Sequence, residues 1–145
     1  KAYMRKSGNT KQWNGAYPDR ETLLEDIARE RLYVYKAEGA IHGVFVLLLE
    51  EEPTYRYIEG GSWLNDEPYG TIHRIATDGE LPGLGSWVIQ WCLDLCGSIR
   101  IDTHEDNRPM RHVLGLLGFV ECGTIWLEDG SPRVAYQHVG VTASD

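Results

Sequence analysis

The chain of 145 residues has a formal net charge of −8 and a hydrophobic share of 42%. This length favours a single domain with its own core, and the acidic charge argues against a nucleic-acid partner, because phosphate binding requires a basic surface. The most hydrophobic segment, residues 40–49, is far shorter than the roughly 20 residues that span a bilayer, so no membrane partner is expected. A negative surface mildly favours cationic substrates such as amines, although solubility accounts for the charge equally well.

The first half of the chain predicts one helix and a β-hairpin. Asp19 is suited to cap a helix over residues 19–31. The apolar stripe of this helix, at helical spacing, consists of Leu23, Leu24, Ile27 and Ala28. Residues 32–36 and 41–50 form two strands joined by a glycine turn, and residues 54–58 are a candidate further strand.

The next segment predicts a strand, a helix and another strand. Residues 69–76 form the first strand, residues 84–96 the helix, and residues 99–102 a short alternating strand. The residues expected to face inward from the helix are Trp87, Val88, Trp91 and Leu95. Such a unit normally forms a right-handed crossover between parallel strands.

The last segment predicts a helix and a second hairpin. Asp106 or Asn107 can cap a helix that runs to residue 117, where a glycine follows. Residues 119–127 and 133–139 flank a turn and return antiparallel. The whole order indicates an α/β fold with a mixed sheet flanked by helices.

A glycine-rich turn, GLGS at residues 83–86, opens the helix after the central strand. Unpaired backbone N–H groups at a helix N-terminus bind phosphates, and glycine lets the backbone approach a ligand closely. Gly83 and Gly85 therefore suit a phosphate cradle, and a tight turn that needs positive φ is the other interpretation. A P-loop is a poor match because no lysine follows Gly85, and a dinucleotide fingerprint is a poor match because position 88 is valine.

Two motifs resemble those of the GNAT superfamily of N-acetyltransferases. Ile75 is followed by ELPGLG at residues 80–85, which resembles the family pattern V-x-x-x-x-[QR]-x-x-G-x-[GA]. Asn107 and the later pair Gly118-Phe119 resemble the family signature N-x-x-A…Y-x-x-x-G-F in their spacing. The resemblance covers roughly residues 32–138 and implies the GNAT-like acyl-CoA N-acyltransferase fold in one domain over residues 1–145.

Three features depart from the family pattern. Glu80 stands where the family usually has Arg or Gln, which puts one phosphate contact in doubt. Leu114 stands where many members carry a tyrosine that protonates the departing thiolate. The family's first strand has no match, so we expect an N-terminally incomplete domain whose missing strand is supplied by upstream residues.

The resemblance implies acetyl-CoA as cosubstrate and an amine as acceptor. The pyrophosphate would lie on the backbone N–H groups of Leu81, Gly83, Leu84, Gly85 and Ser86. The pantetheine arm would pair like an added strand with Ile75 and Thr77. An N–H group near Ile75 or Ala76 would polarise the thioester carbonyl, and Asn107 would contact the pantetheine or a water molecule.

Acetyl transfer to an amine needs a general base. His73 is the first candidate because it lies on the central strand beside the expected thioester, although a histidine packed in the sheet is the other interpretation. His104 and Glu105 are second candidates, and they could instead be solvated loop residues or helix caps. The aromatic candidates for binding the acceptor are Trp13, Tyr17, Trp63 and Tyr69.

The three cysteines, Cys92, Cys96 and Cys122, have no further metal ligands within sequence reach. We therefore interpret them as reduced thiols, predict no metal site, and expect a cytoplasmic location. A homodimer through a sheet edge or the late hairpin is one option for assembly.

Two alternatives to an N-acetyltransferase stay open at this point. One is a catalytically inert acyl-CoA-binding domain used for sensing or interaction, which Glu80 and Leu114 favour. The other is a plain α/β domain whose glycine turn is only structural, and such a domain would not bind CoA.

Overall fold

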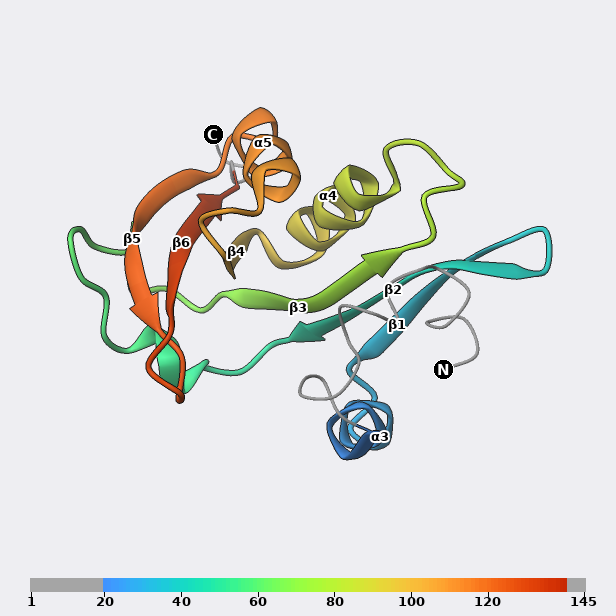
Figure 1. Ribbon diagram of the computed structural model, residues 1–145, viewed down its shortest axis with the longest axis horizontal. Helices are drawn as coiled ribbons and strands as arrows, with labels where there is room; N and C mark the ends of the chain where they lie inside the picture. Colours follow the sequence, from blue (N-terminus) through green and yellow to red (C-terminus); the bar gives the residue numbers. More distant parts are fainter. Residues whose placement is uncertain (1–19, 141–145) are drawn as a thin grey trace.

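The computed structural model describes residues 20–140, which form one mixed sheet with helices on both faces (Figure 1). The helical elements of this part are α3 (Arg20–Ala28), α4 (Leu84–Cys96), α5 (Arg108–Leu116) and the short 3-10 turn η1 (Pro53–Tyr55). The strands of the sheet are β1 (Leu32–Ala37), β2 (Ala40–Leu48), β3 (Gly70–Thr77), β4 (Ser98–Thr103), β5 (Val120–Trp126) and β6 (Pro132–Val139).

The six strands lie in the order β1-β2-β3-β4-β6-β5. All neighbouring pairs are antiparallel except β3 and β4, which run parallel and are connected through α4. The predicted mixed sheet, its two hairpins and its parallel strand–helix–strand unit are therefore confirmed.

The parallel pairing between β3 and β4 is short. Gly70 lies opposite Ile99 and Thr71 lies opposite Arg100, and the ladder goes no further. The two strands therefore separate beyond Thr71, and residues 72–77 of β3 form no ladder with β4.

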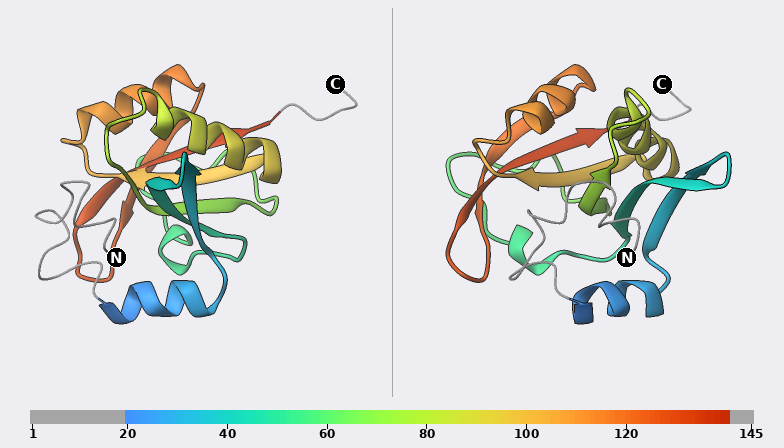
Figure 2. Two further views of the ribbon diagram at one scale, coloured as in Figure 1. Left: turned by 90° about the vertical axis from the view of Figure 1, so that its right-hand side faces the viewer. Right: turned by 45° about the vertical axis from the view of Figure 1, so that its right-hand side comes forward.

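The main core lies between the sheet and the two helices α4 and α5, while α3 and η1 lie on the opposite face (Figures 1 and 2). Ile89 of α4, Ile99 of β4 and Leu114 of α5 meet there with no exposed surface. Full burial of each such side chain stabilises the fold by roughly 1.5–3 kcal/mol. The helix over residues 84–96 begins and ends as predicted, and Asn107 rather than Asp106 caps α5 through a 3.2 Å bond to the N–H of Met110.

Helix α3 differs from its prediction in length and in orientation. It ends at Ala28 rather than near residue 31, and its predicted cap, Asp19, lies outside the described residues. Its fully buried residue is Asp26, whereas Leu24 and Ile27 of the predicted apolar stripe are 42% and 52% exposed. The prediction was wrong because Arg74 of β3 and Arg31, which precedes β1, bond to this helix, and a carboxylate matches two arginines better than an apolar stripe does.

Two further predictions are corrected. The candidate strand at residues 54–58 is replaced by η1, because Glu52 caps the turn and Pro53 suits its first position. Trp87 and Leu95 of α4 were expected to face inward, but they are 52% and 57% exposed. Apolar residues occupy most of the circumference of this helix and leave only the arc of Ser86, Gln90 and Asp94 polar, so their spacing did not determine which of them would be buried.

Candidate active site

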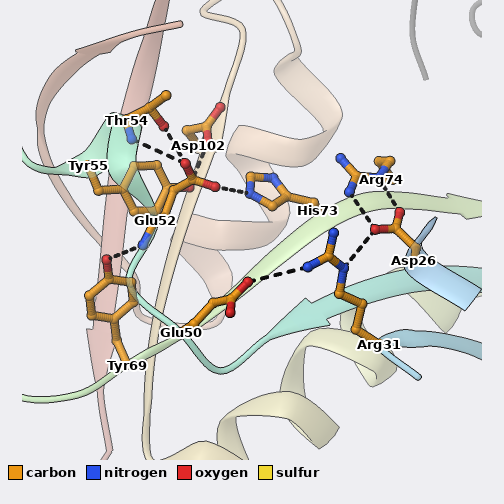
Figure 3. A network of polar contacts seen from close by, with 10 residues as sticks. All are labelled: Asp26, Arg31, Glu50, Glu52, Thr54, Tyr55, Tyr69, His73, Arg74 and Asp102. Carbon is orange, nitrogen blue, oxygen red and sulfur yellow. Dashed lines mark hydrogen bonds and ion pairs between the residues drawn. The ribbon is translucent and has the colours of Figure 1, made fainter. Parts of the chain in front are cut away.

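Strand β3 presents His73 on the sheet face that carries α3 and η1 (Figure 3). Strand alternation places the preceding Ile72 in the core beneath α4 and His73 on the other face. The Nε2 atom of His73 lies 2.9 Å from Oε1 of Glu52, which immediately precedes η1. The fold thus brings the predicted general base beside a carboxylate in the connection between β2 and β3.

Both carboxylate oxygens of Glu52 accept hydrogen bonds. Oε1 faces His73, and Oε2 accepts from the backbone N–H and the hydroxyl of Thr54, each at 3.1 Å. The bond to His73 and the smaller effect of Thr54 outweigh burial and lower the pKa of Glu52 to about 2. Because ionised Glu52 only accepts, neutral His73 must carry its proton on Nε2, which leaves the lone pair on Nδ1.

A second carboxylate lies near the same turn. The hydroxyl of Tyr55, in η1, donates to Oδ2 of Asp102 on β4 at 2.6 Å. Tyr55 is fully buried, and burial together with the nearby charge of Asp102 raises its pKa well above the ordinary value. Tyr55 therefore stays a protonated donor, and η1 is connected to both central strands.

A buried ion network holds α3 beside His73. Arg74 adopts a positive φ of 54° where the pairing of β2 and β3 is irregular, and such bulges redirect side chains. Its Nε and one terminal nitrogen bond the two oxygens of Asp26 at 2.8 and 3.0 Å. Arg31 adds a 2.8 Å bond to the same carboxylate, which has no exposed surface. Figure 3 shows this network next to the His73–Glu52 pair.

The two glycines of the turn before α4 have different reasons to be glycine. Gly83 is the N-cap residue with φ of 77°, so its backbone conformation requires glycine. Gly85 lies in the first helical turn without a positive φ, and a Cβ added there would meet nothing within 4 Å in the described part of the chain. The fold therefore explains Gly83 but does not explain Gly85.

The other predicted acetyl-CoA contacts lie along one path. Ile75, Ala76 and Thr77 occupy the end of β3 where it has separated from β4. The path continues into the turn that contains Leu81, Gly83, Leu84, Gly85 and Ser86. Leu84 also belongs to the core, so its side chain anchors the helix and only its backbone is available to a ligand.

The candidate residues after β4 form local contacts around α5 rather than contacts with the His73–Glu52 pair. His104 and Glu105 are exposed in the turn before α5, and Nδ1 of His104 accepts from the N–H of Asp106 at 3.0 Å. Asn107 uses its side-chain oxygen as the cap of α5. Leu114, at the family's tyrosine position, is a fully buried core residue without a proton to donate.

Trp63 and Tyr69 enclose the guanidinium of Arg100, whose central carbon lies 4.3 and 4.1 Å from the two ring centroids. The indole N–H of Trp63 donates to the carbonyl of Tyr55 at 2.8 Å, and the hydroxyl of Tyr69 accepts from the N–H of Glu52 at 3.0 Å. These two aromatic residues therefore support η1 and Glu52 from behind. Trp13 and Tyr17 lie outside the described residues.

One cluster has the composition of a metal site. Single ligand atoms of His42, Asp78 and Glu80 lie within 4.8 Å of one another beside the glycine turn. Nδ1 of His42 and Oδ2 of Asp78 already form a 2.7 Å contact between the ends of β2 and β3. The cysteines are unlike metal ligands, because burial raises the pKa of Cys92 to about 12 and also raises the pKa values of Cys96 and Cys122.

Sequence reasoning missed Glu52, Tyr55, Asp102 and Asp26. The run of three glutamates before Pro53 was interpreted only as the end of a strand, although an acidic residue before proline is also typical of a capped turn. The partners of the other residues are distant in sequence. Tyr55 and Asp102 are 47 positions apart, and no local pattern indicates that contact.

Comparison with known proteins decides the family. No protein-family model matches the chain, and neither does any curated protein. A GNAT-family acetyltransferase from Streptococcus agalactiae 2603 is 31% identical with a TM-score of 0.81, covering 97% of this chain and 84% of that chain. The chain belongs to the GNAT family of acetyltransferases.

Two more distant structures share the GNAT fold. A putative acetyltransferase from Staphylococcus aureus Mu50 has 22% identity and a TM-score of 0.67, covering 95% of this chain and 88% of its own. The ribosomal-protein-S18-alanine N-acetyltransferase from Escherichia coli has 15% identity and a TM-score of 0.61, with coverages of 98% and 91%. GNAT membership makes acetyl transfer the general activity of this chain.

No helix within residues 20–140 is long and apolar enough to cross a membrane.

Proposed function

We propose that this GNAT protein transfers an acetyl group from acetyl-CoA to a primary amine of a small molecule, an amino acid or a peptide. The observation that carries the proposal is Gly85, a glycine that neither backbone conformation nor crowding requires. Close approach of a phosphate to the N-terminus of α4 gives that glycine a reason, because a side chain there would stand between the ligand and the backbone N–H groups.

The separation of β3 from β4 supports the binding of the pantetheine arm. Beyond Thr71 the β4-facing side of β3 could offer backbone hydrogen bonds to an extended amide chain, for example at Ile75, as a sheet edge does to an added strand. This arm would lead from the glycine turn toward His73. The thioester carbonyl would then lie at the end of β3, where an N–H near Ile75 or Ala76 polarises it.

In the proposed reaction, Nδ1 of His73 removes a proton from the acceptor ammonium while Glu52 fixes the ring through Nε2. The amine lone pair attacks the thioester carbon, and the C–S bond breaks after the tetrahedral intermediate forms. The proton for the departing thiolate comes from His73, the amine or water, because Leu114 cannot supply it. The cytoplasmic location and a homodimer stay predictions.

The second candidate is an inert acyl-CoA-binding domain, which Glu80 and Leu114 favour. The His73→Ala variant separates the two candidates, since an enzyme loses turnover and keeps CoA binding. His104→Ala is the matched control, because His104 is an exposed histidine that bonds the N–H of Asp106 and not Glu52. Equal turnover by the His73→Ala variant and the wild type would remove His73 from the mechanism.

Two glycine variants test the cofactor. Gly85 of α4 and Gly115 of α5 are both helical, and a Cβ added at either meets nothing within 4 Å. We expect Gly→Ala at each to raise the free energy of unfolding by roughly 0.5–1 kcal/mol. Acetyl-CoA and CoA, but not ATP, should raise the melting temperature of the wild type and of Gly115→Ala.

The Gly85→Ala variant should lose at least tenfold in acetyl-CoA affinity in the same thermal titration. Equal affinity of the two alanine variants would contradict the phosphate cradle at Gly85. The absence of any shift with acetyl-CoA in the folded wild type would contradict the cofactor itself.

A further inference from the structure

The carboxylates of Glu52 and Asp102, both near η1, differ in how many of their oxygens accept hydrogen bonds. Glu52 uses both oxygens, one toward His73 and the other toward Thr54. Asp102 uses only Oδ2, which accepts from the hydroxyl of Tyr55. Its Oδ1 has no hydrogen-bond partner within residues 20–140. Both oxygens of Glu52 therefore have hydrogen-bond partners among the described residues, whereas one oxygen of Asp102 has none there.

Asp102 also lacks a cation among the described residues. No Lys, Arg or His side chain of residues 20–140 forms an ion pair with it. Arg100, two positions earlier on the same face of β4, lies between two aromatic rings and donates to the carbonyl of Asn65 at 2.7 Å. Asp102 is partly buried, and a charge removed from water is costly without a partner.

The Asp102 carboxylate is held rigidly. Tyr55 is fully buried and fixes Asp102 with a 2.6 Å bond, while the neighbouring cap residue Glu52 fixes His73. Figure 3 shows the bond from Tyr55 to Asp102 and the bond between Glu52 and His73. Asp102 and His73 are therefore both connected to η1, one through Tyr55 and the other through the cap residue Glu52.

We propose that Asp102 binds a second positive charge of the acceptor, so that the substrate is a small amine with another cationic group, such as a diamine or an arginine derivative. This inference rests on the proposed function, with the reacting nitrogen at His73. A hydrogen bond to a charged group discriminates between acceptors with and without it by roughly 10- to 150-fold. The negative charge of the chain, −8, attracts the same class of molecule.

Two matched pairs of acceptors test the inference. 1,4-Diaminobutane is compared with butylamine, and argininamide with leucinamide, in the acetyl-CoA assay by thiol release. We expect the wild type to prefer the dication of each pair by at least tenfold in kcat/KM. Asp102→Asn, which keeps the shape and can still accept from Tyr55, should lose that preference through a rise in KM that is at least tenfold larger for the dication than for the monoamine of each pair.

Asp94→Asn is the charge-matched control, because Asp94 lies exposed on α4, bonded to Gln90 and far from η1. It should keep the wild-type preference. A wild type without preference for the dications, or an Asp102→Asn variant that loses both members of a pair equally, overturns the inference. Acetylation of none of the four amines by a wild type that binds acetyl-CoA also overturns it, whereas failure to bind acetyl-CoA contradicts the proposed function instead.

Discussion

At the scale of single residues, Glu52 links the stability of this GNAT domain to pH. Its pKa in the folded protein, about 2, lies below the ordinary value of 4.5. Ionised Glu52 therefore stabilises the fold above about pH 4.5, and that contribution is lost as the pH falls from 4.5 toward 2. Screening by solvent reduces the contribution to about 2 kcal/mol.

We expect Glu52→Gln to lower the free energy of unfolding by about 2 kcal/mol at pH 7 and by about half of that or less at pH 3. Urea unfolding of both proteins between pH 3 and pH 7 measures the difference. Glu51→Gln is the neighbouring control, because Glu51 is exposed and its ion-pair partner among the described residues is the exposed Arg56. A difference between wild type and Glu52→Gln that does not shrink toward pH 3 would show that the charge of Glu52 is not the cause.

At the scale of elements, α3 is positioned by charge rather than by apolar burial. Asp26 joins this helix to Arg31 and to Arg74, the latter on the bulge beside His73. Removal of the carboxylate leaves two guanidinium groups without their buried partner. We expect Asp26→Ala to lower the free energy of unfolding by about 3 kcal/mol, measured by urea unfolding.

The control for this variant is Glu25→Ala on the same helix. Glu25 is half exposed, and its ion pairs with Arg29 and Arg31 are longer, at 3.8 and 3.7 Å. Its removal should change the free energy of unfolding by less than about 0.5 kcal/mol. Equal effects of the two variants would mean that α3 is held by its apolar residues.

The elements also show which parts of the fold the sequence could predict. Helix α4 was predicted to the residue because Gly83 and Gly97, both with positive φ, lie at its two ends. The orientation of α3 could not be predicted, because Asp26 and Arg74 are 48 positions apart and no rule of local spacing relates them. In the site, His73 was found from its place on the central strand, whereas Glu52 lies in an irregular connection without periodicity.

At the scale of the whole molecule, the sheet consists of two halves with a narrow join. β1, β2 and β3 form one antiparallel half, and β4, β6 and β5 form the other. Within the sheet the join consists of two residue pairs and the crossover through α4, and outside it the β2–β3 connection contacts the second half through the Glu59–Thr124 bridge and the Tyr55–Asp102 bond. Within residues 20–140, no other pairing between the six named strands connects the halves, so a ligand bound between β3 and β4 would add to a short ladder.

Acetyl-CoA bound between β3 and β4 should protect both halves at once. At a concentration of 100 times its Kd it should add about 2.7 kcal/mol to the free energy of unfolding. We expect amide hydrogen exchange to slow most at residues 72–77 of β3 and next at β4, because exchange there proceeds by local opening of a short ladder. The β5–β6 hairpin, which has its own continuous pairing, is the internal reference. Protection limited to the turn before α4 would mean that the phosphates bind without the arm entering the sheet, and the thioester would then not reach His73.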